Sequence, residues 1–165
     1  MALDIDIQFT GIDGNNIEGS CMQVGREGTS LGNAFEHTVS SPRDAATGKA
    51  TGKRQHGAVK IWKEIDKASP ILAEALYNNS RLQSAVIRFW QSSPDGTENN
   101  YFTCSMQGVR IVSHTIRQLH NRFDNGKDMA VEAFDVFELV YETIEYTYTD
   151  GNISANDSWL RGRRR

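Results

Sequence analysis

A glycine- and lysine-rich run, Gly48-Lys49-Ala50-Thr51-Gly52-Lys53, comes nearest in residue type to a phosphate-binding loop. In such loops four residues separate the glycines, and a Ser or Thr after the lysine binds magnesium. Here three residues separate the glycines and Arg54 follows the lysine. No apolar strand directly precedes the run and no helical pattern follows it, so we do not expect nucleotide binding.

The other residue types that carry chemistry do not form recognisable sites. Four histidines have no HxxxH or HExxH spacing and no cysteine neighbours, so we expect no metal site and no cofactor. The two cysteines, Cys21 and Cys104, lack CxxC spacing and are expected to be small core residues. No Gly-x-Ser-x-Gly motif marks a nucleophile. We therefore expect no catalytic residues.

The charge distribution excludes some partners. The 165 residues carry a net charge of −3, but four arginines lie among residues 161–165, which leaves −7 on residues 1–160. A nucleic-acid-binding domain needs a basic face, which this acidic body does not offer. No run approaches the ~20 apolar residues of a membrane helix. We expect neither a nucleic acid nor a membrane as partner.

Most of the chain alternates apolar and polar residues with a period of two, which is typical of strands with one wet face. Leu3, Ile5, Ile7 and Phe9 set the pattern, and later strands are expected up to about residue 149. Apolar positions are odd at Phe137–Tyr141 and even at Ile144–Tyr148. This change of phase predicts a β-bulge near Glu142-Thr143.

One short helix is expected at about residues 70–78. Ser69 precedes Pro70, which suits a helix start with Ser69 as N-cap, and Leu72, Ala75 and Leu76 share one face. Many short strands with turns between them predict a mainly β fold: two packed antiparallel sheets that form a β-barrel, with this helix at its flank.

Residues 40–55 interrupt the strand pattern. They hold almost no large apolar residue, so a long projecting loop is expected there, and such loops are usually functional or disordered. Residues 41–56 carry a charge of +3, whereas residues 128–150 carry −7 with no Lys or Arg. Opposite charges on separate parts of one chain suit a head-to-tail self-contact.

A run after the loop resembles a known family. His56–Ile65 continues as Asp66-Lys67-Ala68-Ser69-Pro70-Ile71-Leu72, a strand followed by Lys-x-x-Asp-Lys-Ala-Ser-Pro and a short helix. This is similar to the haemolysin-coregulated protein (Hcp) family, the tube proteins of bacterial type VI secretion systems. Further similarity lies at 85–90, 101–103, 109–113 and 141–146, so that it covers about residues 1–150.

The resemblance implies homohexameric rings that stack into a hollow tube, which a contractile sheath expels behind a spike protein and whose lumen carries effector cargo. It implies a single Hcp-like domain over 1–150 and leaves 151–165 as a flexible C-terminal tail. It also implies synthesis in the bacterial cytoplasm and export by the type VI apparatus. We expect no signal peptide, because acids stand near the N-terminus where a signal peptide would be basic.

In this family the long loop between the second and third strands is a stacking element between rings. Residues 40–55 occupy that place here. The candidate ring–ring contacts are therefore Arg43, Asp44, Lys49, Lys53 and Arg54. Two alternatives stay open: a monomeric β-barrel that carries a small apolar ligand, and an enzyme on a β scaffold.

Overall fold

The computed structural model describes residues 4–118 and 133–159. Within them the strands are β1 (Asp4–Thr10), β2 (Asn16–Ile17), β3 (Ser30–Glu36), β4 (Val39–Ser40), β5 (Gln55–His56), β6 (Val59–Glu64), β7 (Arg81–Ser92), β8 (Glu98–Arg117), β9 (Phe134–Val140), β10 (Thr143–Tyr148) and β11 (Ile153–Ser158). Helix α1 is Ala68–Tyr77, and a short 3-10 turn, Asp150–Asn152, joins β10 to β11.

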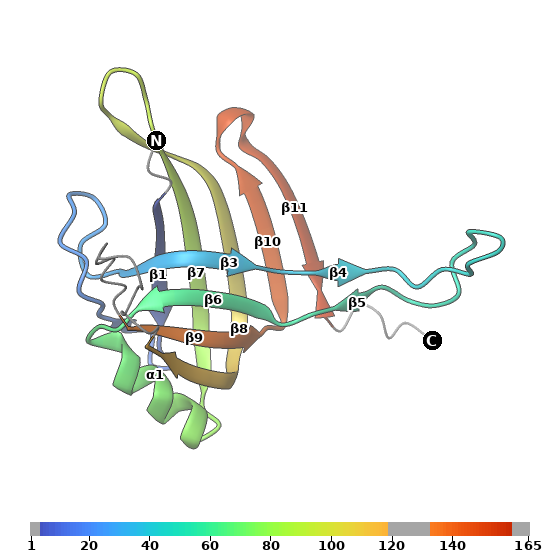
Figure 1. Ribbon diagram of the computed structural model, residues 1–165, viewed down its shortest axis with the longest axis horizontal. Helices are drawn as coiled ribbons and strands as arrows, with labels where there is room; N and C mark the ends of the chain where they lie inside the picture. The colour runs from blue at the N-terminus through green and yellow to red at the C-terminus, as the bar shows by residue number, and fades with distance from the viewer. Residues whose placement is uncertain (1–3, 119–132, 160–165) are drawn as a thin grey trace, which may run out of the picture.

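The strands form an antiparallel barrel with a side extension. The order is β11-β10-β8-β7-β1-β3-β6-β9, and a further β8–β9 pairing closes the ring of six strands from β8 round to β9 (Figure 1). The predicted mainly β fold with a barrel and one flanking helix is confirmed. Apolar side chains from the barrel strands fill its interior, among them Ile7, Phe9, Val59, Ile61, Ile87, Met106, Phe137 and Leu139.

Helix α1 packs against β8 at one end of the barrel. Leu72 is buried, and Ala75 and Leu76 pack against the core as the pattern predicted. The prediction of Ser69 as N-cap is wrong, because the helix begins at Ala68 and the Asp66 carboxylate accepts the Ala68 N–H at 3.0 Å. Pro70 still lies in the first turn, where a missing N–H costs no hydrogen bond.

The predicted bulge near Glu142-Thr143 is also wrong. The chain breaks there into two strands, and both pair with β8: Val140 is opposite Arg110 and Thr143 is opposite Gln107. Three positions separate each pair on both strands, so no residue is extra. The buried face of β8 changes phase at the same point, at Gly108, whose φ is +63°. Since both strands switch together, no bulge is needed.

The C-terminal segment differs from the expected tail. Ile153–Ser158 is strand β11, which pairs with β10 along its full length. The tail prediction failed because the side chains of β11 do little packing: Ile153 is 67% exposed. Backbone hydrogen bonds to β10 hold this strand in place, so its sequence needs no alternation of apolar and polar residues from which a strand could be predicted. The arginines of residues 161–165 lie outside the described residues.

Candidate functional site

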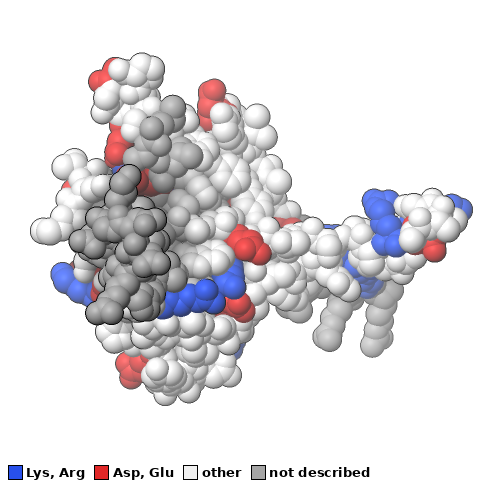
Figure 2. Space-filling view, in the orientation of Figure 1, with Lys and Arg blue, Asp and Glu red and all other residues white. Residues whose placement is uncertain are grey.

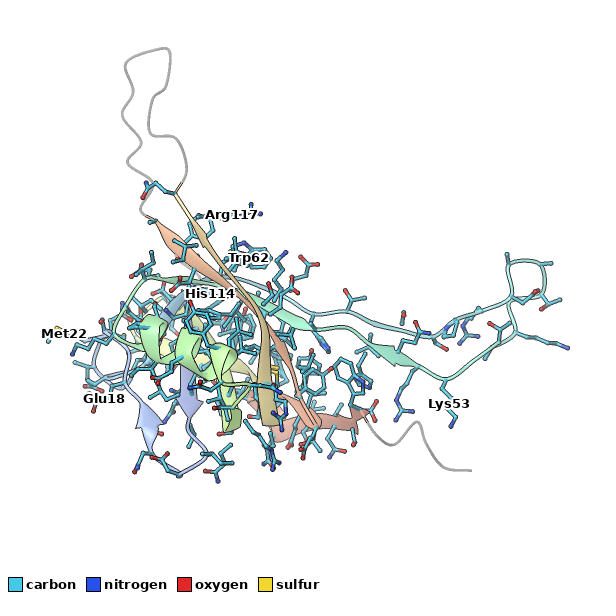
Figure 3. The ribbon with its side chains drawn as sticks, turned by 90° about the horizontal axis from the view of Figure 1, so that it is seen from below. Glu18, Met22, Lys53, Trp62, His114 and Arg117 are labelled. Atoms are coloured by element: carbon cyan, nitrogen blue, oxygen red, sulfur yellow. The ribbon has the colours of Figure 1, made fainter. Side chains whose placement is uncertain are left out.

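The segment 41–54, called the arm below, extends far from the barrel (Figures 1 and 2). It leaves the body through the paired strands β4 and β5. In Figure 3, Lys53 on the arm lies well away from Trp62 and His114 on the barrel. A projecting segment is therefore present where the sequence predicted one.

The arm has its own internal structure. The Asp44 carboxylate accepts the Thr47 hydroxyl at 2.8 Å and the N–H groups of Thr47 and Ala46 at 2.7 and 3.1 Å, and these bonds, the hydroxyl first, lower its pKa. Arg43 donates to the Gly48 carbonyl at 3.1 Å, and its backbone forms a bridge to Ala50. These bonds fix the turn at the tip, so Arg43 and Asp44 shape the arm. Both side chains are exposed.

The remaining predicted contact residues have separate places. Lys49 lies at the tip, next to Gly48, and is exposed. Lys53 is exposed on the segment that returns from the tip to β5 (Figure 3). Arg54 lies at the base of the arm, where its guanidinium makes two hydrogen bonds to the Asp157 carboxylate on β11. Lys49 therefore lies exposed at the tip, whereas Arg54 ties the base of the arm to β11.

The base of the arm is surrounded by polar and aromatic side chains from distant parts of the chain, called the root cluster below. Hydrogen bonding from Arg54 lowers the pKa of Asp157 to about 2, and burial raises that of Tyr141. The His56 ring stacks on Trp159, with centroids 5.7 Å apart. The members are His37, Arg54, His56, Tyr141, Tyr146, Asp157 and Trp159. Sequence reasoning missed this cluster because no local spacing links its parts.

A second polar group, called the buried cluster below, explains the Lys-x-x-Asp-Lys-Ala-Ser motif. The Lys63 ammonium is fully buried and donates to Asp66 Oδ1 at 2.8 Å and Ser69 Oγ at 2.9 Å. It also forms an ion pair with Asp135 on β9, at 3.4 Å. His114 Nε2 lies 2.8 Å from the other Asp135 oxygen. The motif therefore joins β6, the start of α1, β8 and β9.

Much of the acidic region expected over 128–150 is used inside the chain. Asp135 is buried, Glu138 pairs with Lys60, and Glu142 pairs with Arg81. Asp128 and Glu132 lie outside the described residues. The acidic strand region is thus a weaker candidate for an electrostatic partner of the arm than the sequence suggested.

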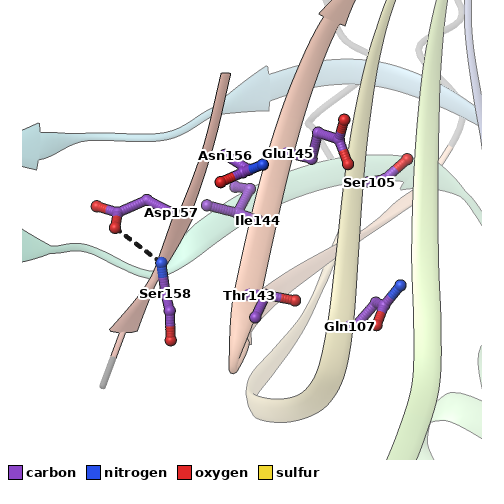
Figure 4. Close-up of a pocket in the computed structure, with 8 residues that line it drawn as sticks. All are labelled: Ser105, Gln107, Thr143, Ile144, Glu145, Asn156, Asp157 and Ser158. Atoms are coloured by element: carbon purple, nitrogen blue, oxygen red, sulfur yellow. Dashed lines mark hydrogen bonds between the residues drawn. The ribbon is translucent and has the colours of Figure 1, made fainter. Parts of the chain in front are cut away.

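A polar hollow of about 480 Å³ lies on the face of the sheet at β8, β10 and β11 (Figure 4). Its lining includes Ser105, Gln107, Thr143, Glu145 and Asn156. Over residues 4–118 and 133–159, no group of three or more His, Cys, Asp or Glu side chains suits a metal ion. Within the same ranges, no helix is long and apolar enough to cross a membrane.

These features define a class of protein: a packed β-barrel whose polar clusters join its own segments, with an internally hydrogen-bonded arm that extends away from the body. Comparisons with known proteins identify the family. Residues 7–148 match the family model described as "Type VI secretion system effector, Hcp". The "Major exported protein" of Pseudomonas aeruginosa is 34% identical over 142 residues, which are 86% of this chain and 81% of that protein.

Solved structures agree. Hcp1 from the E. coli EAEC 042 pathovar is 32% identical, with a TM-score of 0.84 over 96% of this chain and 99% of that one. The secreted protein Hcp3 from Pseudomonas aeruginosa shares the fold, with a TM-score of 0.75 at 24% identity over 96% and 99% of the two chains. The chain belongs to the Hcp family of type VI secretion proteins, a family of secreted structural proteins and not a known enzyme family.

Proposed function

We propose that the protein is the tube-forming subunit of a type VI secretion system. Homohexameric rings stack into a hollow tube, which a contractile sheath expels with a spike protein. The lumen of the tube carries effector cargo. The subunit is made in the bacterial cytoplasm and leaves through this apparatus.

The observation that carries the proposal is the family match over residues 7–148, together with an ordered arm that projects from a closed barrel. An arm that extends beyond its base contacts at Arg54 suits a contact with another copy. Within residues 41–54, internal hydrogen bonds already fix the arm, so little conformational entropy is lost when it docks. Apolar side chains fill the barrel, which counts against the alternative of a monomeric carrier.

The structure refines the proposed ring–ring contacts. The proposed contact with the next ring is formed by Lys49 at the tip together with Lys53 on the segment that returns to β5. Arg54 instead sets the direction of the arm through Asp157, while Arg43 and Asp44 set its shape. An Arg54→Glu variant would place two carboxylates together and disturb the arm itself, so it does not test stacking.

Lys49→Glu is the sharper test. It reverses one exposed charge at the tip, so the ring mass should be unchanged while stacking and secretion fall. Native mass and light scattering measure ring and stack separately. The matched control is Lys67→Glu, the same charge reversal on the exposed Lys67 beside α1, which should leave stacking as in the wild type. Loss of the ring itself in Lys49→Glu would refute the assignment.

A further inference from the structure

A continuous chain of hydrogen-bonded side chains crosses the root of the arm. It begins at Arg54, which donates to the Asp157 carboxylate. His56 Nε2 lies 2.9 Å from the same carboxylate, and His56 Nδ1 lies 2.8 Å from the Tyr141 hydroxyl. The His56 side chain is only 4% exposed, so few water molecules compete for these bonds.

The chain continues inward from Tyr141. Its hydroxyl lies 2.7 Å from His37 Nε2, and His37 Nδ1 is hydrogen-bonded to the Tyr146 hydroxyl. Tyr146 is in turn hydrogen-bonded to the thiol of Cys104, which is fully buried on β8. Both sides of the base of the arm take part: His37 lies in the link between β3 and β4, and His56 belongs to β5.

At neutral pH the donor and the acceptor of each hydrogen bond from Asp157 to Tyr146 can be assigned. Because Asp157 is ionised, it only accepts, so His56 donates from Nε2 and accepts at Nδ1. Tyr141 therefore donates to His56 and accepts from His37 Nε2. His37 then accepts at Nδ1 from Tyr146. Two neutral histidines in the Nε2–H form satisfy all of these bonds at once.

We propose that this series of hydrogen bonds is a proton-operated clamp that holds the arm in a fixed direction and releases it when His37 becomes protonated. Protonation turns His37 Nδ1 from an acceptor into a donor, so Tyr146 can no longer donate to it. The Tyr146 hydroxyl must then point toward Cys104, a weaker acceptor. The new positive charge also lies beside His56, whose ring centroid is 6.5 Å away.

Among residues 4–118 and 133–159, no charge acts on His37 in a way that would compensate for this proton. The other titratable and charged groups of the root cluster are Tyr141 between β9 and β10, Tyr146 on β10, His56 and Arg54 at β5, and Asp157 on β11; Cys104 on β8 lies next to the cluster. The only carboxylate among them is already neutralised by Arg54. Burial first, and then the repulsion that would arise if both His37 and His56 were protonated, lower the pKa of His37 from 6.5.

The sign of the pH dependence follows. A histidine whose pKa is lower in the folded than in the unfolded state binds fewer protons when folded. The clamp is therefore fully closed above pH 6.5 and weakens as the pH falls from there toward the folded pKa. Asp157 acts in a separate window, because its contribution is lost only as the pH falls from 3.8 to about 2.

A backbone hydrogen bond at the base of the arm reports directly on whether the clamp is closed. At the base of the arm, the Gly57 N–H donates to the Thr38 carbonyl at 2.8 Å. Hydrogen exchange of that amide, corrected for its intrinsic rate, should rise by up to about tenfold between about pH 7.5 and about pH 5.5, the limit for one histidine that titrates at 6.5 when released. The Ser80 amide, which donates to Ala75 at the end of α1, is the internal control and should not change.

Two further measurements make the proposal falsifiable. His37→Gln keeps a hydrogen-bonding side chain that cannot titrate, so the pH effect at Gly57 should vanish. Nitrogen NMR of the unaltered protein should show the Nε2–H tautomer for both His37 and His56 at neutral pH, whether or not the variant folds. An unchanged Gly57 protection factor, a pH effect that survives in His37→Gln, or an Nδ1–H tautomer at His56 would overturn the clamp.

The clamp lies within one chain. It bears on tube assembly only through the proposed function, in which the arm contacts the next ring. A protein that forms no rings yet shows the exchange effect would refute the tube and keep the clamp. Rings without the exchange effect would do the reverse.

Discussion

The buried cluster and the root cluster both use polar side chains to join distant segments, yet they differ in their exposure to water. The Lys63 and Asp135 side chains are fully buried, whereas Arg54 is 44% and Asp157 24% exposed. A buried ion pair is costly to break because the remaining charge is left without water. An exposed pair contributes little stability and mainly orients what it joins. The first cluster thus stabilises the fold, and the second directs the arm.

The largest effect is expected for Lys63→Met. Methionine fills a similar volume but leaves Asp135 as a buried carboxylate without its cation. The free energy of unfolding should fall by about 3–5 kcal/mol, measured by denaturant titration. The control is Lys60→Met on the same strand, whose partly exposed pair with Glu138 should be worth less than about 1 kcal/mol. Equal losses in the two variants would erase the difference between the clusters.

A middle effect is expected for Tyr141→Phe. Its hydroxyl is the link between His37 and His56, and its side chain is buried. Removing the hydroxyl leaves two ring nitrogens without a partner, which should lower the free energy of unfolding by about 1–3 kcal/mol. Tyr148→Phe, at a 45% exposed tyrosine of the neighbouring strand, should change it far less. A silent Tyr141→Phe would show that water replaces the hydroxyl and that the root cluster is not a continuous chain.

The smallest effect on stability is expected for Lys49→Glu. The tip contributes no side chain to the barrel core, so the free energy of unfolding should change by less than about 0.5 kcal/mol. Thermal or denaturant unfolding of the variant measures this. A loss as large as that of Tyr141→Phe would mean that the arm supports the fold, and a stacking defect would then have a trivial cause.

The contrast between the two clusters also shows what the sequence can predict. The buried cluster takes Lys63, Asp66 and Ser69 from one short motif, so the motif pointed to its family before the geometry was known. The arm could be predicted because residues 40–55 have almost nothing to bury. The root cluster could not, since His37 and Tyr146 are 109 residues apart and only the folded sheet brings them together.

Two errors have the same physical origin. Strand β11 has no buried apolar side chain, so backbone pairing alone places Asp157 beside Arg54. The bulge near Glu142-Thr143 was inferred from one strand, whereas the outcome depended on the partner strand, where a side chain at Gly108 would collide with Glu142. Pairing between strands is a non-local property, and hydrophobic periodicity reports only on one strand at a time.

Negative-stain imaging of the purified protein distinguishes a ring-forming subunit from a monomer. We expect rings with a central hole, each built from six copies of the 18.5 kDa chain. Single compact particles of one chain's mass at micromolar concentration would contradict it.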